Sequence, residues 1–87
     1  MATYRIEIKL SAQKELAQLP KPMAQKIATQ IRALAENPRP YGCKKLVGTE
    51  HSYRIRVNDY RVVYSVFDQQ LMVQVIKLAH RKDVYKQ

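Results

Sequence analysis

The chain has 87 residues, with sixteen Lys and Arg against seven Asp and Glu, which gives a formal net charge of +9. A chain of this length forms one small domain with one core, so residues 1–87 are expected to fold as a single unit with room for one site. The positive charge favours a polyanionic partner, nucleic acid first, and also an acidic protein. The only cysteine excludes an internal disulfide, and no stretch is apolar for long enough to span a membrane, so a soluble cytoplasmic protein is expected.

The first half of the chain predicts a strand followed by two helices. Apolar and charged residues alternate over residues 4–10, which is typical of a strand with one buried face. The spacing changes to a helical one from Ala12, and Lys21-Pro22 interrupts it with a proline suited to the first turn of a second helix. That helix carries an apolar stripe and is expected to end at Asn37-Pro38; the stripe consists of Met23, Ile27, Ile31 and Leu34.

The second half predicts a run of strands. Residues 44–47 follow a Pro- and Gly-rich loop and form a short strand or the approach to one. Two alternating runs, 53–57 and 60–64, flank Asn58-Asp59, which predicts a hairpin with a two-residue loop. Its register pairs Val57 with Tyr60, Arg56 with Arg61, Ile55 with Val62 and Tyr53 with Tyr64.

A second hairpin is expected to close at Asp68-Gln69, which would pair Val66 with Leu71 and Tyr64 with Val73. On that register Ile76, Leu78 and His80 lie on the same side of the sheet as Arg56 and Arg61. The element order β-α-α-β-β-β therefore predicts an α+β fold, in which a helical pair packs on one face of an antiparallel sheet.

The first hairpin places Arg54, Arg56 and Arg61 together on the face away from the core. Like charges directly opposite each other destabilise a sheet, so this face is best explained by an anion that binds there. A phosphodiester suits several forked guanidinium groups at once. The competing interpretation is an ordinary solvated basic face.

The chemistry of other side chains suggests further candidates. Imidazole titrates near neutral pH, so His80 is the candidate proton carrier at the rim of the basic face, while His51 is expected on the surface. Tyr85 either anchors the C-terminus or stacks on an unpaired base. The expected contacts to the RNA backbone are Lys44, Lys45, Lys77 and Lys82.

The chain lacks a Gly-rich phosphate loop, a serine with a base at recognisable spacing and an acidic cluster for Mg²⁺. A nuclease built from these residues is expected to need no metal or other cofactor. The route open to it is attack by the 2′-hydroxyl of RNA on the adjacent phosphorus, which leaves a cyclic phosphate and a 5′-hydroxyl. The protein would orient the chain, stabilise a dianionic transition state and move two protons.

Three segments carry a resemblance to a known family: Tyr53–Val57, Tyr60–Tyr64 and His80–Tyr85. With the Asn37-Pro38 helix stop and Lys45-Leu46 before Gly48, the chain resembles the RelE branch of the RelE/ParE toxin superfamily. The resemblance implies a ribosome-dependent mRNA interferase that cuts messenger RNA in the decoding site. It also implies an acidic antitoxin that covers the toxin in a hetero-oligomer.

The resemblance further implies roles for single residues. Arg54 and Arg56 stand where the family often has lysines that contact the scissile phosphate, one of which is proposed as the base. Because arginine is effectively never deprotonated, that role would pass to His80 or to a purely electrostatic mechanism. Arg61 matches the family's arginine that stabilises the transition state. Arg81 matches the arginine near the leaving oxygen, and Tyr85 matches the tyrosine that stacks on a base and orients the attacking ribose.

Two alternatives to RNA cleavage remain at this stage. A ParE-like protein resembles the same fold but inhibits DNA gyrase by binding it, and a nucleic-acid-binding module would bind RNA without chemistry. The three-arginine hairpin and the terminal Asp83-Val84-Tyr85 favour the RNA branch.

Overall fold

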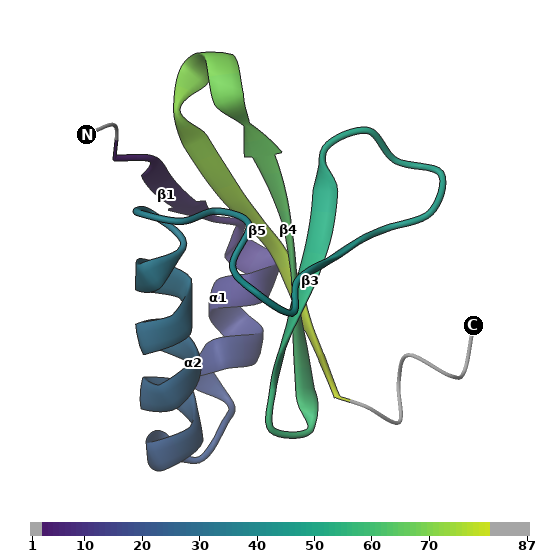
Figure 1. Ribbon diagram of the computed structural model, residues 1–87. Coiled ribbons are helices and arrows are strands. Elements are labelled where there is room, and N and C mark those ends of the chain that lie inside the picture. The colour runs from purple at the N-terminus through teal and green to yellow at the C-terminus, as the bar shows by residue number, and fades with distance from the viewer. Residues whose placement is uncertain (1–2, 81–87) are drawn as a thin grey trace.

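The computed structural model describes residues 3–80. The elements in chain order are β1 (Arg5–Ile8), α1 (Leu10–Ala17), α2 (Lys21–Ala33), β2 (Lys44–Lys45), β3 (Ser52–Val57), β4 (Tyr60–Phe67), a 3₁₀ turn (Asp68–Gln70) and β5 (Met72–His80). The two helices lie against one face of the sheet (Figure 1). Its five strands are arranged in the order β1-β5-β4-β3-β2. Within the described residues, no helix is long and apolar enough to cross a membrane.

The α+β class is confirmed, with one correction to the sheet. The sheet is mixed rather than wholly antiparallel, because β1 runs parallel to β5, with Arg5 opposite Met72 and Ile8 opposite Val75. The hairpins of the second half fix the antiparallel strands locally. The partner of β1 lies more than sixty residues away in the chain, so no local pattern reveals its direction. The two-residue strand β2 adds a strand to the predicted order.

The core lies between the helical pair and the sheet. The predicted apolar stripe is confirmed, since Ile27, Ile31 and Leu34 are at most 2% exposed, although α2 ends at Ala33, before the predicted stop at Asn37-Pro38, and Leu34 follows it as the C-cap. Leu16, Leu19 and Met23 are partly buried against the same core. The sheet supplies the opposing side chains, each 0% exposed: Val62, Tyr64, Val66, Val73 and Val75.

The first hairpin has the predicted register. Val57 pairs with Tyr60, Arg56 with Arg61 and Ile55 with Val62. The two-residue loop is possible because Asn58 adopts a left-handed conformation, with φ +55°, which asparagine tolerates better than most residues. The three arginines of this hairpin consequently lie on the sheet face away from the helices.

The second hairpin was predicted with the wrong register. Val66 pairs with Val73 and Tyr64 with Val75, a shift of two residues from the expected pairing. The loop contains four residues rather than two, because a 3₁₀ turn follows β4 and Leu71 then takes a left-handed conformation with φ +49°. Leucine rarely adopts this conformation, so the sequence does not reveal the longer loop.

A bulge in β5 then reverses the faces of its last residues. The register of β4 and β5 changes between Val63 and Tyr64, which leaves Ile76 as the extra residue. Leu78 therefore pairs with Val62 in the core, and Lys77 lies on the open face instead. Leu78 lies beyond the residues of β5 that pair with β1. Its backbone N–H donates instead to Glu15 Oε1 of α1 at 3.0 Å, which provides a hydrogen-bond partner that β1 does not supply.

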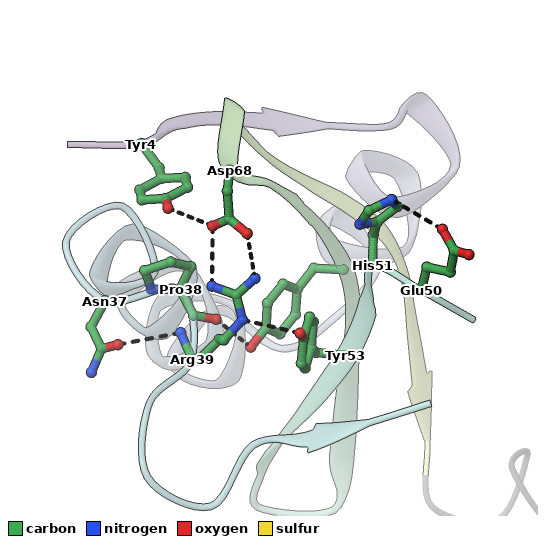
Figure 2. Close-up of polar contacts among 9 residues, drawn as sticks. Tyr4, Asn37, Pro38, Arg39, Glu50, His51, Tyr53 and Asp68 are labelled. Atoms are coloured by element: carbon green, nitrogen blue, oxygen red, sulfur yellow. Dashed lines mark hydrogen bonds and ion pairs between the residues drawn. The ribbon is translucent and has the colours of Figure 1, made fainter. Parts of the chain in front are cut away.

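An ion-pair network fixes the loop between α2 and β2 (Figure 2). Arg39 donates to both carboxylate oxygens of Asp68, at 3.1 and 2.7 Å, and its Nε donates to the Tyr53 hydroxyl at 3.0 Å. Tyr4 also donates to Asp68, at 2.6 Å. Next to this network, the buried Tyr64 hydroxyl donates to the carbonyl of Pro38 at 2.8 Å. The network thus joins the start of β1, the β4–β5 loop and the approach to β2.

The acid dependence of stability should report on this network. Hydrogen bonds from Arg39 and Tyr4 lower the pKa of Asp68 to about 2. A lowered folded-state pKa means that the contribution to stability is complete above the ordinary pKa near 4 and is lost as the pH falls towards about 2. We expect Asp68→Asn to lower the urea midpoint at pH 7 and to flatten its decline between pH 4 and pH 2.

Asp59→Asn, at an exposed aspartate of the β3–β4 loop, is the matched control and should leave the decline in place. An Asp68→Asn protein with the wild-type acid profile would contradict the role of the ion pair.

Candidate phosphate-binding face

Five cations on the open face of the sheet lie in two adjacent rows across β2 to β5. Residues that pair directly across a ladder project to the same face. Lys44 pairs with Arg54, Arg54 with Val63 and Val63 with Lys77, which makes the first row. Arg56 pairs with Arg61 and Arg61 with Ala79, which makes the second. The predicted grouping of the three arginines is therefore present, and Lys44 and Lys77 join it through the first row.

Four of these cations surround a shallow cleft of about 270 Å³. We call it the arginine cleft; its lining consists of Gly42, Lys44, Arg54, Arg56 and Arg61. Sequence reasoning did not select Gly42, which has φ +90° and turns the chain just before β2 begins. A glycine between a proline-rich loop and the Lys44-Lys45 strand is the signal that could have identified it.

The hairpin holds its arginines in different ways. Arg56 is exposed, and its Nε donates to the backbone carbonyl of Asn58 at 2.9 Å, which ties the side chain to the hairpin loop. Arg54 and Arg61 are half-buried in the face. Arg56 and Arg61 are direct cross-strand partners, so an anion between them would relieve a like-charge repulsion that the fold imposes. Guanidinium groups form forked, charge-assisted hydrogen bonds to phosphate oxygens.

His80 does not lie on this face, which corrects the sequence prediction. Because of the bulge, His80 pairs with Tyr60 on the helix-side face. The two rings meet edge to face, with centroids 5.1 Å apart. Tyr60 itself packs against the core, so the imidazole and the arginine cleft lie on opposite sides of the sheet.

The remaining sequence predictions for charged and titratable side chains fall into three groups. Lys45 pairs with Tyr53 and faces the helix side, so it is not grouped with the arginines. His51 is exposed as predicted, with Nε2 3.8 Å from a carboxylate oxygen of Glu50 (Figure 2). The remaining candidates, Arg81, Lys82 and Tyr85, lie outside the described residues.

The donor set of the cleft suits an oxyanion. Its charged side chains are one lysine and three arginines, all of them hydrogen-bond donors. Across residues 3–80, His, Cys, Asp and Glu form no group of three or more that could hold a metal ion. The fold and this face together define a small, basic α+β protein with one sheet face suited to phosphate groups.

Comparisons with known proteins place this class more narrowly. Residues 6–85 match the family described as "ParE toxin of type II toxin-antitoxin system, parDE". A putative RelE-like toxin protein of Escherichia coli is 33% identical over 86 residues, covering 94% of this chain and 90% of the relative. The archaeal RelE–RelB complex from Pyrococcus horikoshii contains a chain of the same fold, with TM-score 0.82, 34% identity and coverage of 91% and 96%. The chain belongs to the RelE/ParE family of type II toxin–antitoxin toxins, on its RelE branch.

Proposed function

We propose that this chain is a ribosome-dependent mRNA interferase, a metal-independent endoribonuclease that inhibits translation in the cytoplasm. The arginine cleft is the observation that supports the proposal, since it gathers three forked cations and a lysine on an open face of the sheet. Membership of the RelE branch supports the ribosome as the place where messenger RNA is presented. The structure of the intact E. coli RelBE toxin–antitoxin complex contains a chain of the same fold, with TM-score 0.78 and 28% identity.

The reaction needs an anion-stabilising surface more than it needs a nucleophile from the protein. The 2′-hydroxyl of the substrate attacks the adjacent phosphorus, the bond to the 5′-oxygen breaks, and a 2′,3′-cyclic phosphate and a 5′-hydroxyl result. Arg54 and Arg56 would hold the non-bridging oxygens, and Arg61 would stabilise the extra negative charge of the transition state. Following the family resemblance, Arg81 would act near the leaving oxygen, and Tyr85 would stack on a base and orient the ribose.

Primer extension on a translated message is the direct test. The wild-type toxin should produce discrete cuts within codons, and Arg61→Ala should lower the single-turnover rate about a hundredfold, because one charge-assisted contact to a transition state contributes on the order of 3 kcal/mol. Arg32→Ala, at an exposed arginine of α2, is the matched control and should cut normally.

A gyrase supercoiling assay run in parallel separates the alternatives. Inhibition of supercoiling without RNA cuts would establish a ParE-like activity instead. Binding of RNA without either activity would leave a non-catalytic module. Full cleavage by folded Arg61→Ala protein would contradict the assignment of the cleft.

The register of β4 and β5 changes which residue is expected to act as the general base. The arginines of the cleft cannot give up a proton, and His80 faces the other side of the sheet. Of the side chains that line the cleft, Lys44 is the one whose neutral form could accept the 2′-hydroxyl proton.

Lys44→Arg and His80→Gln should therefore behave differently. Lys44→Arg keeps the positive charge and loses the ability to accept a proton, so we expect slower single-turnover cleavage with little change in the concentration of ribosomes needed for half-saturation. His80→Gln should retain the rate. Slow cleavage by His80→Gln, with Lys44→Arg cleaving normally, would restore histidine as the base.

An acidic antitoxin is the proposed protein partner, in a hetero-oligomer that covers the arginine cleft. The +9 charge should steer the encounter, so the association rate constant should fall steeply as ionic strength rises, while dissociation changes less. Stopped-flow measurements between low and high salt would show this slope. Arg54→Ala should reduce the slope and Arg32→Ala should not; an association rate independent of salt would contradict a charged interface.

A further inference from the structure

Tyr41 presents a large aromatic ring that is fully exposed to solvent. Its relative exposure is 106%, against 0% for Tyr64 of the core. A tyrosine ring buries a large apolar surface when it finds a partner, and such rings are enriched where a binding partner covers them. The residues around this ring therefore indicate which kind of partner could cover it.

The loop holds the backbone of Tyr41 in a defined turn. The backbone N–H of Cys43 donates to the carbonyl of Pro40 at 3.0 Å, which closes a β-turn with Tyr41 as its second residue and Gly42 as its third. The φ of +90° at Gly42 is that of a type II turn, whose third residue needs a positive φ. Pro40 restricts the start of the turn, and the Arg39–Asp68 ion pair fixes the chain just before it (Figure 2). The backbone that carries the ring is consequently ordered before any partner binds.

Tyr41 directly precedes Gly42, which lines the arginine cleft. A second hollow of about 240 Å³ adjoins the cleft and shares two of its lining residues, Gly42 and Arg56. Tyr41 lines this second hollow, and the remaining lining residues are Gln30, Pro40 and Ile55. Ile55 faces the helix side and Gln30 belongs to α2, so the second hollow lies at the edge of the sheet, and Gly42 and Arg56 connect it to the cleft of three arginines and a lysine.

Cations beside an isolated aromatic ring favour single-stranded nucleic acid over a protein partner. Successive phosphates follow the basic groove, and an unpaired base stacks on the ring. An aromatic residue that anchors a protein interface is usually surrounded by other contacts that exclude water from it. The second hollow instead has a mixed lining, in which the polar side chains of Gln30 and Arg56 lie beside Pro40 and Ile55.

We propose that Tyr41 is a stacking platform for one unpaired RNA base, next to the nucleotides whose phosphates bind the arginine cleft. The inference rests on the proposed function in that RNA is the ligand of the cleft. It adds a subsite that selects single-stranded over paired RNA, because a base within a duplex offers no free ring face.

Fluorescence provides a test that does not depend on cleavage. The chain has no tryptophan, so Tyr41→Trp introduces a single indole at the proposed platform. We expect a short 2′-O-methyl RNA, which lacks the attacking hydroxyl, to quench this fluorescence on binding, and inorganic polyphosphate of similar charge to bind without quenching. Val47→Trp is the matched control, since Val47 is also fully exposed, with a relative exposure of 102%, and lies on the other side of β2 in the chain.

Affinity gives the second readout. Tyr41→Ala should weaken binding of the same RNA about tenfold, the scale of one base–aromatic stack, whereas Tyr41→Phe should bind like the wild type. Equal quenching by RNA and polyphosphate, or wild-type affinity in Tyr41→Ala, would overturn the inference. A Tyr41→Ala protein that loses antitoxin binding and keeps RNA binding would do so as well, by assigning the ring to the protein interface.

The two proposals fail in distinguishable ways. Wild-type cleavage of messenger RNA, together with a Tyr41→Trp protein whose fluorescence RNA does not quench, would remove the stacking subsite and leave the enzyme. Quenching by RNA without any cleavage would keep the subsite and remove the proposed enzymatic function.

Discussion

Burial along β3 and β4 is the constraint on which the rest of the site depends. Ile55 and Val62 are at most 6% exposed and face each other beneath the helices. A slip of one residue would expose such side chains, at a cost of roughly 1.5–3 kcal/mol for each. The repulsion between Arg56 and Arg61 on an open face is smaller, comparable to the roughly 0.2–1 kcal/mol of other cross-strand pairs. Burial therefore wins, and the hydrophobic face sets two guanidinium groups opposite each other whether or not an anion is bound.

The difference between local and long-range interactions explains how much of the fold can be predicted from the sequence. The first hairpin could be predicted because period-two alternation and Asn58 agree on one register. The second could not, because Leu71 adopts a conformation that leucine rarely takes and Ile76 is inserted as a bulge. A distant partner stabilises the strand just after the bulge, since Glu15 on α1 accepts the N–H of Leu78. A sequence pattern contains the local preference and not the contact that overrides it.

The bulge had the larger consequence for the candidate site. The arginines lie before the bulge in the chain, so alternation alone was enough to predict their shared face. Lys44 joins this face through the pairing of β2 with β3. His80 lies after the bulge, and one extra residue moved the imidazole to the opposite face. Residue type identified His80 as the candidate proton carrier and Lys44 as a backbone contact, whereas only the register shows that Lys44, and not His80, lies beside the arginines. Tyr41 escaped sequence reasoning for a related reason, since exposure of a loop residue has no periodic signal.

Charge and shape contribute differently to the proposed binding surface. At physiological salt, exposed charges act over about 8 Å, so the net charge attracts RNA and an acidic protein alike and discriminates weakly between them. Discrimination has to come from groups that only one ligand can use. Forked guanidinium groups favour the tetrahedral phosphate, although they also bind carboxylates. On the proposed stacking role, the exposed ring of Tyr41, next to Gly42 of the cleft, adds a contact that a base can make and an acidic side chain cannot. On the proposed function, the three arginines set how fast any polyanion arrives, and Tyr41 helps determine which one stays.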